Sequence, residues 1–171
     1  HLVADAIGKK AMIVPTHWAP FTLTARILGL EPLLVATLQE PEKLSRLIQF
    51  STDLTWAILE RIIEHPDIPG ANLSDPVASG DVVSPLTFRQ FSAPAIRDLV
   101  GRLKAKKKYA MVHICGNTTR VLPDVLEIGP HCFSLENKVD LKAAREILGG
   151  KVCVAGNVSP TGAFLSGTPE Q

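Results

Sequence analysis

Five short runs, separated by longer amphipathic stretches, constrain the fold of this chain most strongly. They cover residues 11–15, 71–75, 109–115, 131–136 and 151–155, of which 71–75 is the least apolar. Apolar runs of this length are typical of strands that are buried on both faces. Strands that alternate with helices predict a parallel sheet with right-handed crossovers, which is an α/β fold.

The stretches between these runs carry helix signals. Residues 41–65 repeat apolar side chains at spacings of three and four, as one buried helix face requires. Thr168 and Pro169 predict a helix start close to the end of the chain. Other helices are expected over 22–28, ending at Gly29; over 85–107, with Ser84 as N-cap and a break at Pro94; over 118–128; over 141–148, between Asp140 and Gly149; and from Ser159 and Pro160 onward.

Polar residues follow the carboxyl ends of these strands. His17, Asp75, His113, Glu136 and Asn157 each lie at or just past such an end. In a β/α barrel these ends converge on one face, and that face carries the active site. No Gly-x-Gly-x-x-Gly follows the first strand, so a dinucleotide-binding domain has no support. We therefore predict a fragment of a (β/α)8 TIM barrel with about five βα units.

The chain is expected to be part of a longer protein, because a closed barrel needs eight strands. It opens on His1 without a methionine and ends on a helix start. Residues 1–171 are predicted to form one partial barrel domain that lacks N-terminal and C-terminal parts. An open half-barrel leaves a strand edge unpaired, so we expect it to pair with another copy or with a missing segment.

Composition excludes some classes of function. The chain is 46% hydrophobic and 20% charged with a net charge of +1, which is globular and too balanced to indicate nucleic-acid binding. No apolar run approaches the ~20 residues of a membrane span, and no signal peptide is visible, so no membrane partner is expected. An odd count of three cysteines argues against a disulfide framework and favours the cytoplasm.

His113 and Cys115 carry the strongest chemical signal. On a strand they project from the same face, and an imidazole beside a thiol is half of a tetrahedral zinc site. A catalytic zinc keeps a position open, where a substrate thiol loses its proton below its usual pKa of about 8.5. The alternative is a core histidine beside a small buried cysteine. Gly116 favours the metal, because a glycine lets the chain turn closely around a ligand.

The third zinc ligand is less clear from the sequence. Cys132 starts its strand and Cys153 lies mid-strand, so both are expected in the core. Glu136 lies at the correct end, where it would bind zinc or orient His113. Otherwise, the third ligand lies beyond Gln171.

Other candidates have polar side chains that suit substrate contacts. Asp75 is expected to bind a substrate cation or to handle a proton, with a local Asp-Pro turn as the alternative. His17 and Asn117 are predicted to contact substrate. Asn157 is predicted to do the same, or else only to hold its own turn.

Three motifs resemble the uroporphyrinogen decarboxylase superfamily, a group of β/α barrels. They are Ala19-Pro-Phe-Thr22, then Asp75-Pro-Val-Ala-Ser-Gly-Asp-Val-Val-Ser-Pro85 with Phe88 and Phe91, and Ala155-Gly-Asn-Val-Ser-Pro160. The resemblance covers essentially the whole chain. Within the superfamily, His113-Ile-Cys-Gly-Asn117 is similar to the zinc-dependent methylcobalamin:thiol methyltransferases of the coenzyme M type.

This resemblance implies a function and its partners. His113 and Cys115 would be two zinc ligands, with a third cysteine in the missing C-terminal region. A zinc-bound thiolate would take the methyl group from methyl-cobalt(III) on a separate corrinoid carrier protein, and the acceptor would be a small thiol or a pterin. The alternatives are a metal-free uroporphyrinogen decarboxylase, in which Asp75 contacts the tetrapyrrole, and a non-catalytic corrinoid- or tetrapyrrole-binding barrel.

Overall fold

One parallel sheet organises the molecule. The computed structural model describes residues 2–168, and its five strands pair in the order in which they occur along the chain. They are β1 (Thr16–Trp18), β2 (Gly70–Ser74), β3 (Tyr109–His113), β4 (Cys132–Ser134) and β5 (Cys153–Ala155). All four pairings are parallel. This consecutive order is that of a barrel segment, whereas a doubly wound sheet reverses its strand order at a switch point.

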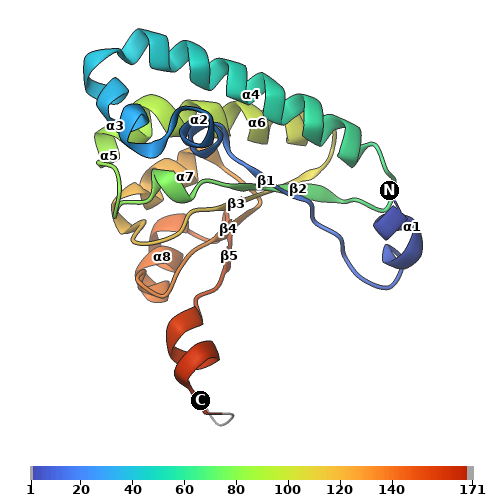
Figure 1. Cartoon of the computed structure of the whole chain (residues 1–171). Coiled ribbons are helices and arrows are strands. Elements are labelled where there is room, and N and C mark those ends of the chain that lie inside the picture. The colour runs from blue at the N-terminus through green and yellow to red at the C-terminus, as the bar shows by residue number, and fades with distance from the viewer. Residues whose placement is uncertain (1, 169–171) are drawn as a thin grey trace.

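Helical segments form the crossovers between these strands. Figure 1 shows α2, α4 and α6 packed along one side of the sheet. The α-helices are α1 (Leu2–Ile7), α2 (Pro20–Leu28), α3 (Leu30–Gln39), α4 (Pro41–Ile63), α5 (Pro85–Thr87), α6 (Ala93–Ala105), α7 (Leu122–Ile128) and α8 (Leu141–Leu148). The 3-10 turns are η1 (Pro76–Ala78) and η3 (Thr119–Val121), and the π-helical turns are η2 (Phe88–Ser92) and η4 (Pro160–Ser166).

The two faces of the sheet differ in burial. Leu73, Val112 and Phe133 are in register on β2, β3 and β4, and all three are buried in the core beneath the helices. On the other face of β3 and β4, Met111 and His113 are only partly buried and Tyr109 is exposed. A barrel has the same arrangement, with helices outside and the other face of the sheet turned inward.

Most predicted elements are confirmed. The predicted caps are present, because Ser84 Oγ accepts from Thr87 N at 3.1 Å and Asp140 Oδ1 accepts from Ala143 N at 2.7 Å. The break expected at Pro94 is also present, as the π-helical turn η2 directly before it. A proline lacks the amide hydrogen and crowds the preceding turn, so a widened turn accommodates it.

One expectation was wrong, one helix was not expected, and one expectation lies outside the described residues. Residues 11–15 are irregular rather than a strand, and the ladder begins where the Pro15 carbonyl accepts from Asn72 N at 2.8 Å. The helix α3 was not expected; it accommodates Pro32 because a proline in the first helical turn costs no hydrogen bond. The predicted helix start at Thr168 leads into residues 169–171, which the structure does not describe.

In residues 2–168, no single helix has both the length and the hydropathy of a membrane span. The helices α2 and α3 have the required length and hydropathy only when taken together, and the two are bent by 110° at Gly29.

Candidate functional site

A row of side chains crosses the sheet near its carboxyl end. Its members occupy equivalent positions on the five strands and are Trp18, Ser74, His113, Ser134 and Ala155. Residues in register on parallel strands leave the sheet on the same side. The row therefore places His113 near the middle of the strand ends, on the side opposite the buried Leu73 and Val112.

His113 is held in an orientation that suits a metal ligand. Its Nδ1 lies 3.1 Å from the carbonyl oxygen of Ser134 and 3.0 Å from the Ser134 hydroxyl. A carbonyl oxygen can only accept, so Nδ1 carries the ring proton and Nε2 carries the lone pair. Nε2 faces Cys115 Sγ at 3.1 Å. This is the tautomer that metal-binding histidines adopt when a backbone carbonyl anchors the other nitrogen.

Glu136 lies beside the same thiol. Partial burial, followed by the charge and hydrogen bond of Glu136, raises the pKa of the Cys115 thiol above its usual value. Cys115 is therefore protonated at neutral pH while no cation lies beside it. A bound cation would reverse this balance, because it favours the thiolate.

The donor set fits zinc in part. Tetrahedral zinc with bonds near 2.3 Å to sulfur and 2.0 Å to nitrogen separates the two donors by about 3.5 Å. His113 Nε2 and Cys115 Sγ need only a small adjustment from 3.1 Å to reach this separation. Within residues 2–168, no three His, Cys, Asp or Glu side chains are arranged to hold a metal. The two donors are in place, and a third is not.

The loop after β3 is packed closely against the loop after β2. Gly116 has a φ of +71°, and a Cβ there would meet Ser79 Oγ and the Asp81 carboxylate. Asp81 also binds Lys138 at 2.7 Å, which links the loops after β2 and β4. The predicted substrate contact Asn117 is exposed, and its Oδ1 accepts from Thr119 N at 3.1 Å.

Replacing Gly116 by alanine is expected to destabilise this loop and weaken metal binding by the protein. Gly149→Ala is the matched control, because Gly149 also has a positive φ, +58°, but has open space where the Cβ would be. The free energy of unfolding of the control is expected to fall by about 1 kcal/mol, from backbone strain alone. That of Gly116→Ala is expected to fall clearly more. Urea denaturation and metal titration of both variants measure the difference. Equal losses in the two variants would show that the close approach at Gly116 is unimportant.

Asp75 directly follows β2, and its amide donates to the carbonyl of His113 at 2.8 Å. It is fully buried, and Thr22 donates to Oδ1 from its amide at 2.9 Å and from its hydroxyl at 2.5 Å. Ser92 donates to Oδ2 at 2.6 Å. Burial outweighs these bonds and raises the pKa of Asp75 to about 6. The carboxylate joins α2, β2 and η2, and a catalytic role for it stays a prediction.

Two other residues, His17 and Asn157, were also predicted to contact substrate. His17 is in register with the buried Leu73, so its side chain leaves the sheet on the face opposite His113, and its Nδ1 lies 3.0 Å from the Trp18 carbonyl. Asn157 is near the strand ends, where its amide donates to the carbonyls of Val139 at 2.7 Å and Glu136 at 3.4 Å. Asn157 thus holds the loop after β4 rather than its own turn, and a substrate contact by Asn157 stays a prediction.

The other two cysteines are not in the core. Cys132 is only partly buried and Cys153 is exposed, both on the sheet face that carries His113. Burial and the neighbouring Cys153 raise the pKa of the Cys132 thiol to about 11. The prediction of buried cysteines was wrong because their apolar neighbours in sequence, such as Phe133, face the helices instead.

Ser134 and the Asp81–Lys138 pair were missed in the sequence. Ser134 sits in register with His113, but a serine in a strand carries no signal of its own, and its role depends on strand pairing. The strand alternation could have revealed it, because Ser134 precedes Glu136 by two residues on the same face.

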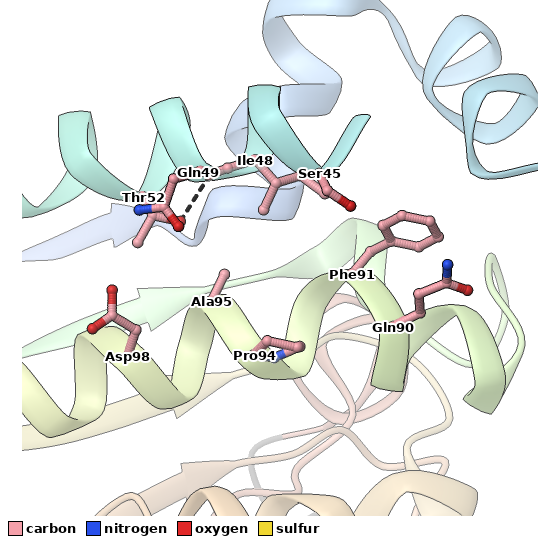
Figure 2. Close-up of a pocket in the computed structure, with 9 residues that line it drawn as sticks. All are labelled: Ser45, Ile48, Gln49, Thr52, Gln90, Phe91, Pro94, Ala95 and Asp98. Atoms are coloured by element: carbon pink, nitrogen blue, oxygen red, sulfur yellow. Dashed lines mark hydrogen bonds between the residues drawn. The ribbon is translucent and has the colours of Figure 1, made fainter. Parts of the chain in front are cut away.

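A separate groove lies on the helical side of the molecule. It has a volume of about 350 Å³, and Figure 2 shows it between α4 and the α6 region, lined by residues such as Gln49, Phe91 and Asp98. None of the predicted site residues lines it, and the sheet separates it from His113. We therefore place the candidate site at the strand ends, not in this groove.

Comparison with known proteins finds methyltransferases and decarboxylases among the relatives of this chain. The methylated-thiol–coenzyme M methyltransferase of Methanosarcina mazei is 32% identical over 162 residues, which are 93% of this chain and 42% of that protein. The methylcobamide:CoM methyltransferase MtaA of Methanosarcina barkeri is 25% identical over 170 residues, 97% of this chain and 48% of that protein. Uroporphyrinogen decarboxylases match over shorter stretches, one at 35% identity over 85 residues. The chain thus spans less than half the length of these relatives.

The fold has a close counterpart among solved structures. A methyltransferase from Methanosarcina mazei superposes with a TM-score of 0.84 at 23% identity, over 92% of this chain and 46% of that one. The chain is therefore about half of a TIM-barrel-like fold, as its consecutive parallel strands predict. The family model for uroporphyrinogen decarboxylase (URO-D) matches all of residues 1–171. On this match, the chain belongs to the URO-D family.

Proposed function

We propose that the protein transfers a methyl group between a protein-bound corrinoid and a thiol, with zinc held by His113 and Cys115. The observation that carries this proposal is the convergence of His113 Nε2 and Cys115 Sγ at 3.1 Å, with Nδ1 fixed by Ser134. A bound zinc would hold the substrate sulfur as a thiolate near neutral pH. A decarboxylase that works without a metal has no use for such a pair.

Each residue of the site has a part in this proposal. His113 offers a lone pair in a fixed direction, because Ser134 holds its other nitrogen. Glu136 raises the pKa of the Cys115 thiol by its charge, so it lies near enough to take up the proton that Sγ loses when a metal binds. The third protein ligand would come from outside residues 2–168.

The partners are inferred from the names of the relatives and from the position of the site. Methylcobamide and coenzyme M in those names favour a corrinoid protein as one partner and a small thiol as the other. A corrinoid carrier would approach the open strand ends, where βα loops form the active sites of barrels. A pterin acceptor is the alternative to a thiol. The cytoplasm suits a protein whose cysteines act as thiols.

The test uses the full-length protein with zinc, methylcobalamin and a small thiol. Transfer is expected to convert the methylcobalamin spectrum to that of cob(I)alamin while the methyl thioether appears in equal amount. The same protein is incubated with uroporphyrinogen as the test of the metal-free decarboxylase. Loss of carboxylates without methyl transfer would overturn the proposal, and binding of corrinoid with no turnover would favour a non-catalytic barrel.

A further inference from the structure

A chain of polar contacts joins the loops that follow four consecutive strands. The side-chain amide of Asn157, after β5, donates to two carbonyls of the loop after β4. Lys138 of that loop binds Asp81 Oδ2, in the loop after β2, at 2.7 Å. The same oxygen accepts from the backbone amide of Asn117, after β3, at 3.3 Å. All four loops belong to the described residues, so these contacts form without the rest of the barrel.

Two glycines let the loops after β2 and β3 approach each other at the level of the backbone. A Cβ at Gly116 would meet Ser79 Oγ and the Asp81 carboxylate. A Cβ at Gly80 would meet the carbonyl oxygen of Asn117. Ser79 is buried, and its hydroxyl accepts from the Asp81 amide at 3.2 Å. The loop after β2 therefore presents the Asp81 carboxylate to the backbone of the turn after β3.

This turn sets the direction of the Cys115 side chain. Cys115 lies two residues past the end of β3, so strand pairing ends before it. The next two residues, Gly116 and Asn117, both lie with their backbone against Asp81. A shift of this backbone would turn Cys115 Sγ away from His113 Nε2, which it faces at 3.1 Å.

We infer that Asp81, held by Lys138, is the positioning residue of the Cys115 thiol. It fixes the turn after β3 so that Sγ faces the lone pair of His113 Nε2. The inference rests on the proposed function, because zinc is the group for which the thiol is positioned. Losing an outer partner of a metal ligand costs about 10–100-fold in metal affinity. An exposed ion pair contributes little by itself, so most of the effect is expected from the contact of the carboxylate with the turn.

The test compares the zinc affinity of full-length variants by competition with a chromogenic chelator. Asp81→Ala is expected to weaken zinc binding by about 10-fold. Asp81→Asn keeps an oxygen for the Asn117 amide and is expected to bind zinc nearly as tightly as the wild-type protein. Glu60→Ala is the matched control, because Glu60 pairs with Lys106 at 2.8 Å and the side chains of the two pairs have similar exposure, 36% and 55% against 42% and 54%. Equal zinc affinity of Asp81→Ala and Glu60→Ala would overturn the inference.

Cobalt(II) substitution reports on the bond between Cys115 and the metal. The thiolate-to-cobalt charge-transfer band is expected to weaken in Asp81→Ala and to be preserved in Asp81→Asn and Glu60→Ala. The circular dichroism spectra are expected to be the same, which separates a misdirected thiol from a misfolded protein. A band of wild-type intensity in Asp81→Ala would contradict a positioning role.

Hydrogen exchange without metal separates this inference from the proposed function. In the metal-free protein, amides of residues 115–118 are expected to exchange faster in Asp81→Ala than in Asp81→Asn or Glu60→Ala, because the Asn117 amide loses its acceptor. Unchanged exchange would overturn the inference, whether or not the protein binds zinc. A wild-type protein that binds no zinc, together with faster exchange in Asp81→Ala, would overturn the proposed function alone and support the positioning of the thiol.

Discussion

His113→Ala and Cys115→Ser are each expected to remove zinc from the full-length protein and to lower its rate of methyl transfer more than about 100-fold. Losing an outer partner of a metal ligand costs about 10–100-fold in affinity or activity, and losing a direct ligand costs more. Two donors converge at 3.1 Å and a third is proposed outside residues 2–168, so each substitution leaves too few protein ligands for the three that a catalytic zinc has. Metal content after dialysis and single-turnover transfer from methylcobalamin measure the two effects.

Two further variants sharpen this prediction. Ser134→Ala keeps the carbonyl that accepts from His113 Nδ1 and removes only the hydroxyl. The rate of methyl transfer is therefore expected to decrease by only about 10-fold. His131→Asn is the control, because it keeps an acceptor for the Ala110 amide at the opposite end of the strands. Zinc retained at wild-type levels by His113→Ala would contradict the assignment of this ligand.

Asp75→Ala is expected to lower the free energy of unfolding by about 3 kcal/mol. The substitution leaves the Thr22 amide and the hydroxyls of Thr22 and Ser92 without their acceptor in a fully buried place. Each unsatisfied buried group costs about 1–3 kcal/mol, and a rotating hydroxyl recovers part of this. Asp75→Asn is the matched variant, because its amide keeps an oxygen toward Thr22 and lets Ser92 turn to accept. Equal stability of the Ala and Asn variants would contradict an anchoring role for Asp75.

The pH dependence of stability also reports on Asp75. Its pKa rises from 3.8 to about 6 in the folded protein, so the folded state holds the proton more tightly than the unfolded state. The resulting stabilisation is fully present below about pH 4 and is lost as the pH rises through 6. Its size is about 3 kcal/mol, from about two pKa units at 1.36 kcal/mol each. Asp75→Asn is expected to abolish this slope in urea denaturation between pH 4 and 7, and an unchanged slope would assign it to another group.

The same two variants separate a structural role of Asp75 from a chemical one. If Asp75 handles a proton or binds a cationic group, Asp75→Asn loses activity while its stability at pH 7 is preserved. If Asp75 only joins α2, β2 and η2, the Asn variant keeps both.

The fold could be predicted from the sequence because its signals are local. The caps Ser84 and Asp140, the stop at Gly29 and the apolar spacing in α4 each depend on neighbouring residues alone. The short strand β1 was displaced to Thr16–Trp18 because its pairing with β2, rather than its own hydropathy, sets its limits. The helix α3 forms although it contains Pro32, because a proline in the first helical turn loses no hydrogen bond.

The site could be predicted in part, since alternation on a single strand places His113 beside Cys115 without any knowledge of its neighbours. What surrounds the pair depends on register between strands, which sets Ser134 beside His113 and Cys132 beside Cys153. The direction of the His17 side chain depends on register too. The burial of Asp75 beneath Thr22 and Ser92 joins residues 53 and 17 positions apart, which no local pattern reveals.

We propose above all that His113 and Cys115 bind zinc directly. Zinc K-edge X-ray absorption of the zinc-loaded full-length protein tests this claim most directly. We expect sulfur at about 2.3 Å and imidazole nitrogen at about 2.0 Å from the metal. Cys115→Ser should reduce the sulfur contribution, and His113→Ala should remove the imidazole signal or the metal itself. A spectrum that both substitutions leave unchanged would contradict the account.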